Sequence, residues 1–75
     1  MTPMMFFMKT LDQLDAELTA LPDSSYRHRG LSRVAAARTH APRNFAYAER
    51  MLDEARFELS YARELNQIKN LRSKS

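Results

Sequence analysis

The 75-residue chain contains no cysteine, no tryptophan and a single glycine. The absence of cysteine excludes disulfide bonds and fits a reducing compartment, from which we expect a cytoplasmic protein. One glycine and three prolines are too few for the many tight turns of a β-rich fold. The remaining composition is rich in alanine, leucine and arginine, which favour helices, so we expect an all-α protein.

The chain also lacks a long apolar segment. A membrane-spanning helix requires about 20 consecutive apolar residues, and no run approaches that length, so we expect no membrane span. The apolar run Met4–Met8 has no preceding positive side chain and is too short for the core of a signal peptide. Residues 1–9 are interpreted as an apolar arm or the start of the first helix, and residues 10–75 as a single helical domain. Because Met8 is followed by lysine and threonine, it is also typical of a natural start.

Residue types for metal binding and catalysis are few. The only histidines, His28 and His40, are twelve residues apart without clustered carboxylates, so we expect no metal site and no cofactor. Asp23, Ser24, Ser25 and His28 include the residue types of a catalytic triad, but neighbours in sequence do not supply triad geometry. One glycine cannot form a phosphate-binding loop, and so small a helical chain lacks the depth for a closed pocket. We therefore do not expect an enzyme.

Apolar residues recur at helical spacing near the N-terminus. They predict a first helix with a narrow leucine face, and they are Phe7, Leu11, Leu14, Leu18 and Leu21. Thr10 followed by Gln13 fits a capping box, whereas Thr2 followed by Pro3 offers an earlier start. Pro22 ends this helix, because the residue before a proline avoids the α region.

Two further helices are predicted. Gly30 weakens any helix that includes it, so the second helix is expected to be short and to cover Leu31–Arg38. The third helix covers about Arg43–Arg72 and is roughly 45 Å long, with Thr39 or His40 as its cap. We expect the first and third helices to pair in antiparallel fashion, which gives a helical hairpin with a short middle helix or connector.

The third helix carries alanine and leucine in alternation at steps of four and three residues. This Ala/Leu seam has the spacing of a heptad repeat, and it comprises Ala48, Leu52, Ala55, Leu59 and Ala62. Alanine in a seam lets another helix approach closely, from the same chain or from a second copy. A domain of this size buries only roughly 60% of its unfolded surface, and no disulfide or metal stabilises it. We therefore expect a homodimer that forms through this seam.

Charge is unevenly distributed along the chain. No acidic residue lies between Asp23 and Glu49, and this arginine segment contains Arg27, Arg29, Arg33, Arg38 and Arg43. Such a segment predicts a basic patch that binds an anionic partner, such as nucleic acid or an acidic protein surface. Alternatively, the arginines neutralise the acids of the first helix or lie in a solvated connector. The segment has too few aromatic residues to stack bases, which argues against nucleic acid.

A second apolar face lies opposite the Ala/Leu seam on the third helix. At 100° per residue this outer stripe comprises Phe57, Tyr61, Ile68 and Leu71. The outer stripe is covered by the first helix or a second chain, or it binds a target protein together with Met4–Met8. We predict a small, non-enzymatic adaptor or inhibitor, regulatory or chaperone-like, that docks onto a larger protein. The alternative is a nucleic-acid-associated regulator that uses the arginine segment.

Overall fold

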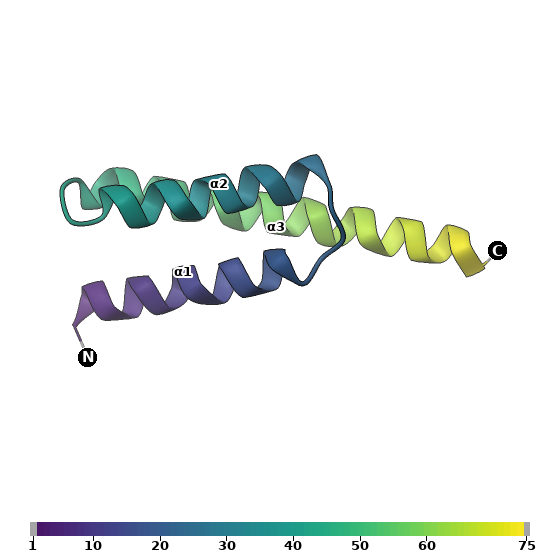
Figure 1. Cartoon of the computed structure of the whole chain (residues 1–75), viewed down its shortest axis with the longest axis horizontal. Coiled ribbons are helices and arrows are strands. Elements are labelled where there is room, and N and C mark those ends of the chain that lie inside the picture. The colour runs from purple at the N-terminus through teal and green to yellow at the C-terminus, as the bar shows by residue number, and fades with distance from the viewer. Residues whose placement is uncertain (1, 75) are drawn as a thin grey trace.

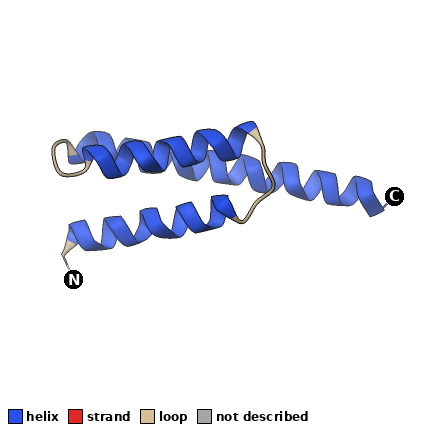
Figure 2. Cartoon of the chain, viewed as in Figure 1, coloured by secondary structure: helices blue, strands red, loops and turns tan. Residues whose placement is uncertain are grey.

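The structure is a computed structural model that describes residues 2–74, with side chains described for residues 2–72. Three helices, α1 (Pro3–Thr19), α2 (Ser25–His40) and α3 (Phe45–Lys74), account for nearly all of this range (Figure 1 and Figure 2). No strand occurs among the described residues, so the expected all-α class is confirmed. The helices form a rod with extents of 49 × 22 × 14 Å.

The helices alternate in direction along the rod (Figure 1). α2 and α3 run antiparallel and make the most extensive helix contact, and a short turn at residues 41–44 joins them. α1 lies along this pair and runs in the same direction as α3. The expected antiparallel pairing of the first and third helices is therefore wrong, because a full second helix reverses the chain between them. The C-terminal part of α3 extends past the ends of both other helices (Figure 1).

α1 begins at the earlier of its two candidate starts. The hydroxyl of Thr2 accepts a hydrogen bond from the Met5 N–H at 3.2 Å, and Pro3 occupies the first helical position. Proline is favoured there because it has no N–H to leave unpaired. Thr10 is not a cap, since it lies inside the helix and its hydroxyl donates to the Phe6 carbonyl at 3.0 Å. Of the two interpretations of residues 1–9, the start of the first helix is the one observed for the described residues.

α2 is twice as long as expected, because Gly30 does not interrupt it. The helix begins after Ser24, whose hydroxyl accepts from the Arg27 N–H at 3.1 Å, and continues for 16 residues. Gly30 is buried and faces Leu18 of α1. A Cβ added at Gly30 would lie 2.8 and 2.9 Å from the two methyl carbons of Leu18. The missing side chain therefore permits close helix packing, which offsets its cost in helix propensity.

α3 begins two residues later than expected, with Asn44 as its cap. The Asn44 side-chain oxygen accepts from the Tyr47 N–H at 3.1 Å. Thr39 and His40, the expected caps, instead form the last turn of α2, where the Thr39 hydroxyl donates to the Ala35 carbonyl. The sequence contains this signal, because asparagine is among the residues most favoured at the start of a helix.

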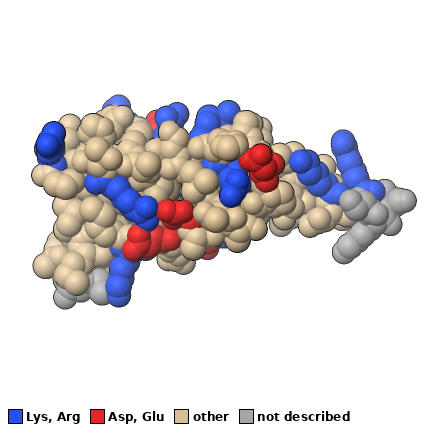
Figure 3. Space-filling model, viewed as in Figure 1, with Lys and Arg blue, Asp and Glu red and all other residues tan. Residues whose placement is uncertain are grey.

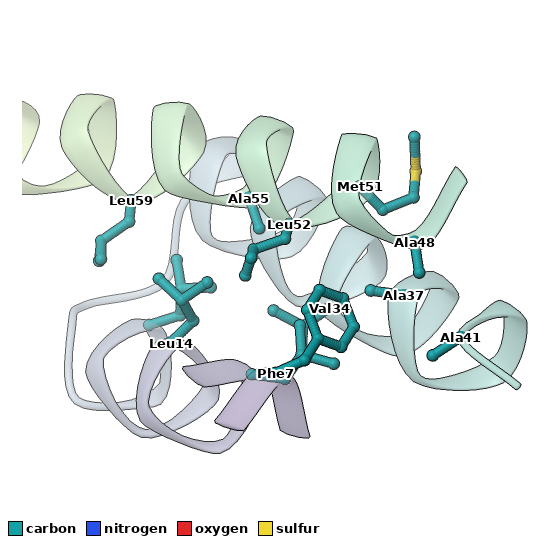
Figure 4. Close-up of a cluster of buried hydrophobic side chains, with 12 residues drawn as sticks. Phe7, Leu14, Val34, Ala37, Ala41, Ala48, Met51, Leu52, Ala55 and Leu59 are labelled. Carbon is teal, nitrogen blue, oxygen red and sulfur yellow. The ribbon is translucent and has the colours of Figure 1, made fainter. Parts of the chain in front are cut away.

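The core draws side chains from all three helices (Figure 4). Its buried members include Phe7, Leu11, Leu14 and Leu18 from α1, Val34 and Ala37 from α2, and Ala48, Met51, Leu52, Ala55, Leu59 and Ala62 from α3. α1 thus contributes large side chains, and α2 contributes small ones. Burial of an alternating large and small set is typical of a close-packed helical core.

The Ala/Leu seam lies entirely within this core. Ala48 and Ala55 have no exposed surface, and Leu52, the most exposed seam residue, is 8% exposed. In Figure 4, Leu52 and Leu59 point toward the α1 side chains, and Ala48 lies beside Ala37 of α2. The helices that cover the seam belong to the same chain. This corrects the assignment of the seam to a self-association surface, because its side chains are already buried without a second copy.

Candidate functional site

Two members of the arginine segment join α2 to α3. The Arg29 Nε lies 3.2 Å from a carboxylate oxygen of Glu58, and the Arg33 Nε lies 3.2 Å from one of Glu54. The pairs follow the antiparallel register, because the later residue of α2 meets the earlier residue of α3. The Arg29 guanidinium also lies 5.1 Å from the centre of the Tyr26 ring, within the range of a cation–π contact.

Two other arginines of the segment contact α1 or the loop that follows it. Arg38 bridges two carboxylates, with nitrogen–oxygen distances of 2.6 Å to Asp12 and 3.1 Å to Asp15. The Arg27 Nε donates to the Leu18 carbonyl at 3.1 Å, near the C-terminal end of α1. The same carbonyl also accepts from the Leu21 N–H at 3.1 Å, and a guanidinium beside it suits the negative end of the helix dipole.

Arg43 is the exception in this segment. It lies in the exposed turn between α2 and α3, and no carboxylate of the described side chains lies within ion-pair distance of it. On the face drawn in Figure 3, blue and red groups adjoin over the middle of the rod. The structure thus brings four of the five segment arginines to carboxylates or a carbonyl of the same chain. Only Arg38 pairs with acids of the first helix, as one alternative expected, because the acids that meet Arg29 and Arg33 belong to α3.

The outer stripe is exposed along its whole length. Phe57 is 63% exposed and Leu71 is 69% exposed, while Tyr61 and Ile68 are each 48% exposed. α1 and α2 lie on the opposite side of α3, where they cover the Ala/Leu seam. Tyr61 alone of the four has an aromatic neighbour, Tyr26 of α2, with ring centres 5.6 Å apart.

A second exposed apolar group lies at the N-terminal end of the rod. Met4, Met5 and Phe6 are exposed on the first turn of α1, and Phe45 on the first turn of α3 is 37% exposed. The Phe45 ring packs edge-on against Phe7, with centres 4.9 Å apart, so the two helix starts adjoin. The sequence predicts the N-terminal apolar run, but it gives no prediction of an exposed Phe45 beside it. The exposure of the run itself can be predicted, because consecutive apolar residues on a helix point in different directions and cannot all reach one core.

The polar residues considered for catalysis serve the start of α2. The Ser24 hydroxyl caps the helix, and the His28 Nε2 lies 2.7 Å from an Asp23 carboxylate oxygen in an exposed pair. An open groove of about 450 Å³ separates α1 from α3, with Leu14 and Leu59 on its lining and polar side chains around them. Within residues 2–72, no three histidine or acidic side chains come together as a metal site would require.

No protein-family model, curated protein or solved structure matches the chain. None of the helices in the described part of the chain is long and apolar enough to cross a membrane.

Proposed function

We propose that this chain is a small non-enzymatic adaptor or inhibitor, regulatory or chaperone-like, that docks onto a larger protein through the outer stripe of α3. The exposure of four large apolar side chains along one side of one helix carries this proposal. Single exposed apolar residues are common on protein surfaces, but four large ones on the same side of one helix are typical of an interaction site.

The spacing of the outer stripe indicates what kind of partner fits it. Phe57 and Tyr61 are four residues apart, and Ile68 and Leu71 are three apart, as in the repeat that packs one helix against another. Glu64 is exposed and occupies the position between the two pairs. The partner that fits is an amphipathic helix of another protein, with an apolar row and a basic residue that faces Glu64.

The extension of α3 supports the same proposal. The C-terminal part of α3 continues past α1 and α2 (Figure 1). None of the described side chains after Ala62, Ile68 and Leu71 included, is buried. A helix that projects from its own bundle can be approached from several sides, so a partner meets no steric barrier from the rest of the chain. Nucleic-acid binding, the alternative function, is less well supported, because Arg29, Arg33 and Arg38 already pair with carboxylates.

The test is affinity capture from the native host with a matched pair of variants. Phe57→Ser combined with Leu71→Ser removes the two most exposed residues of the outer stripe. Ser32→Ala combined with Ala35→Ser alters two exposed positions of α2 and is the control. We expect a captured protein that survives nuclease treatment, that is retained by the control, and that is lost with the stripe variant. Truncation of interface anchors commonly costs about 2 kcal/mol or more, enough to abolish a moderate-affinity capture.

Circular dichroism and sedimentation equilibrium complete the experiment. Because both stripe positions are exposed, the stripe variant is expected to keep the wild-type spectrum and melting temperature. Capture that is equal for both variants contradicts the proposal. A wild-type dimer that the stripe variant dissociates shows instead that a second copy of this chain occupies the outer stripe. Nucleic acid as the sole captured material supports the alternative function.

A further inference from the structure

The N-terminal end of the rod carries an apolar tip that the proposed function does not use. We define the apolar tip as Met4, Met5, Phe6 and Phe45. Met5 is 55% exposed and Phe6 is 66% exposed, and contact between Phe7 and Phe45 joins the α1 and α3 parts of the tip. The outer stripe begins twelve residues after Phe45 and follows α3 toward the C-terminus, which lies at the opposite end of the rod, so the two surfaces are distinct (Figure 1).

The geometry of the apolar tip does not suit a helical partner. A helix that binds another helix uses residues three and four apart, which share one side. Met4, Met5 and Phe6 are consecutive and therefore point in three directions, about 100° apart around the end of α1. A planar apolar phase entered by the end of the rod can cover all three side chains at once, whereas one neighbouring helix cannot.

At the start of α1, most of the first backbone N–H groups are absent or hydrogen-bonded within the chain. The first N–H groups of a helix have no helical partner, and exposing them to hydrocarbon is costly. Here Pro3 has no N–H, the Met5 N–H donates to the Thr2 hydroxyl at 3.2 Å, and the Phe6 N–H donates to the Thr2 carbonyl at 3.1 Å. Of the four residues from Pro3 to Phe6, three therefore have no N–H group that depends on water for a hydrogen bond.

The surroundings of the apolar tip are basic. Lys9 lies one turn along α1 from Met5, and Arg43 lies two residues before Phe45. Both are exposed, and among the described side chains neither has a carboxylate within ion-pair distance. The chain has no acidic residue before Asp12 and none between Asp23 and Glu49. In Figure 3 the left-hand end of the rod is largely tan, with separate blue groups beside it and no red.

From these observations we propose that the apolar tip inserts into the interfacial region of a lipid bilayer that contains anionic lipid. Phe and Met side chains enter the boundary between headgroups and acyl chains, while Lys9 and Arg43 remain at the level of the anionic headgroups. The rod is held at the membrane by one end and does not cross it. The outer stripe of α3 then remains accessible to a protein partner, so the two proposals are independent.

Vesicle flotation tests this proposal with the full chain. The vesicles contain phosphatidylcholine alone or phosphatidylcholine mixed with phosphatidylserine. We expect the wild type to float with the mixed vesicles and to bind the neutral ones more weakly. Met5→Ser combined with Phe6→Ser is expected to lower binding to the mixed vesicles by about tenfold or more, because it removes the side chains that enter the bilayer. The control is the stripe variant, Phe57→Ser combined with Leu71→Ser, which removes equally exposed apolar residues and is expected to bind vesicles as the wild type does.

Charge and depth give two further measurements. Lys9→Gln combined with Arg43→Gln is expected to reduce the preference for mixed over neutral vesicles by up to about fivefold for each charge removed. The chain has no tryptophan, so Phe6→Trp introduces a single reporter at the apolar tip. Its emission is expected to shift to shorter wavelength when mixed vesicles are added, whereas a tryptophan placed by Phe57→Trp is expected to show no shift.

Three results would overturn the proposal. The first is no flotation of the wild type with either vesicle. The second is equal loss of flotation in the tip and stripe variants, which would mean that apolar content alone drives binding. The third is a tip variant that binds vesicles like the wild type but loses a captured protein, in which case the apolar tip contacts protein rather than lipid.

Discussion

Replacing Gly30 with alanine sets two effects of known size against each other. Alanine is favoured over glycine inside a helix by about 1 kcal/mol. Against this, the new Cβ would lie 2.8 and 2.9 Å from both methyl carbons of Leu18, which has no exposed surface and little freedom to move. Overpacking of a core typically costs about 1–3 kcal/mol, so we expect a net loss of about 1 kcal/mol. For a domain of this size, that loss lowers the melting temperature by roughly 4–8 °C.

Thermal and urea unfolding monitored by circular dichroism measure the effect, and two further variants isolate its cause. Ala35→Gly changes an exposed position of the same helix and reports propensity alone, with an expected loss of about 1 kcal/mol. Leu18→Val is expected to be less destabilising when Gly30→Ala is also present, because the shorter side chain makes room for the new methyl group. If Gly30→Ala instead stabilises the protein by about 1 kcal/mol, the close contact between α1 and α2 is refuted.

Two further predictions concern the Ala/Leu seam and the ion pairs. Because Ala55 is fully buried within one chain, Ala55→Leu is expected to lower the free energy of unfolding by about 1–3 kcal/mol. In thermal melts this loss is expected to be independent of protein concentration. A loss that disappears at high protein concentration would show that the seam is a dimer interface. Arg38→Gln removes the half-exposed ion pairs with Asp12 and Asp15 and is expected to lower the free energy of unfolding by less than about 1 kcal/mol. Added salt is expected to reduce this loss of stability. An equal loss at low and high salt would show that packing of the aliphatic part of Arg38, rather than its charge, is responsible.

The sequence contains enough information to predict the class of the fold and the faces of two helices. The apolar row of α1 and the Ala/Leu seam of α3 repeat at helical spacing and are buried, except that Leu21 follows the end of α1 and is only half-buried. The angular positions of the outer stripe predict that its four residues share one face, whereas their exposure is seen only in the structure. Each of these conclusions depends on residues within two turns of one another along one helix, where helix geometry fixes the relation.

The remaining features depend on residues that are distant in the sequence. Whether Gly30 breaks a helix or admits a neighbour is decided by Leu18, which belongs to a different helix. The arginine segment has the composition of a nucleic-acid site, yet Arg33 pairs with Glu54 across the hairpin. No pattern within the segment indicates this pairing, because it follows from which helices are neighbours. The same limit applies to the seam, since alanine spacing predicts a close partner without saying which chain supplies it.

The ion pairs of α2 explain how a helix with few large apolar residues takes a defined place in the bundle. Its core-facing side chains are small, with Val34 the largest fully buried one, and small side chains pack almost equally well in several registers. Arg29 and Arg33 fix the register of α2 against α3, and Arg38 fixes α1 on the other side. Each exposed pair contributes little stability alone, but a shifted register would separate all of them together. The intramolecular pairs of Arg29, Arg33 and Arg38 are therefore better explained as determinants of helix order than as a phosphate-binding patch.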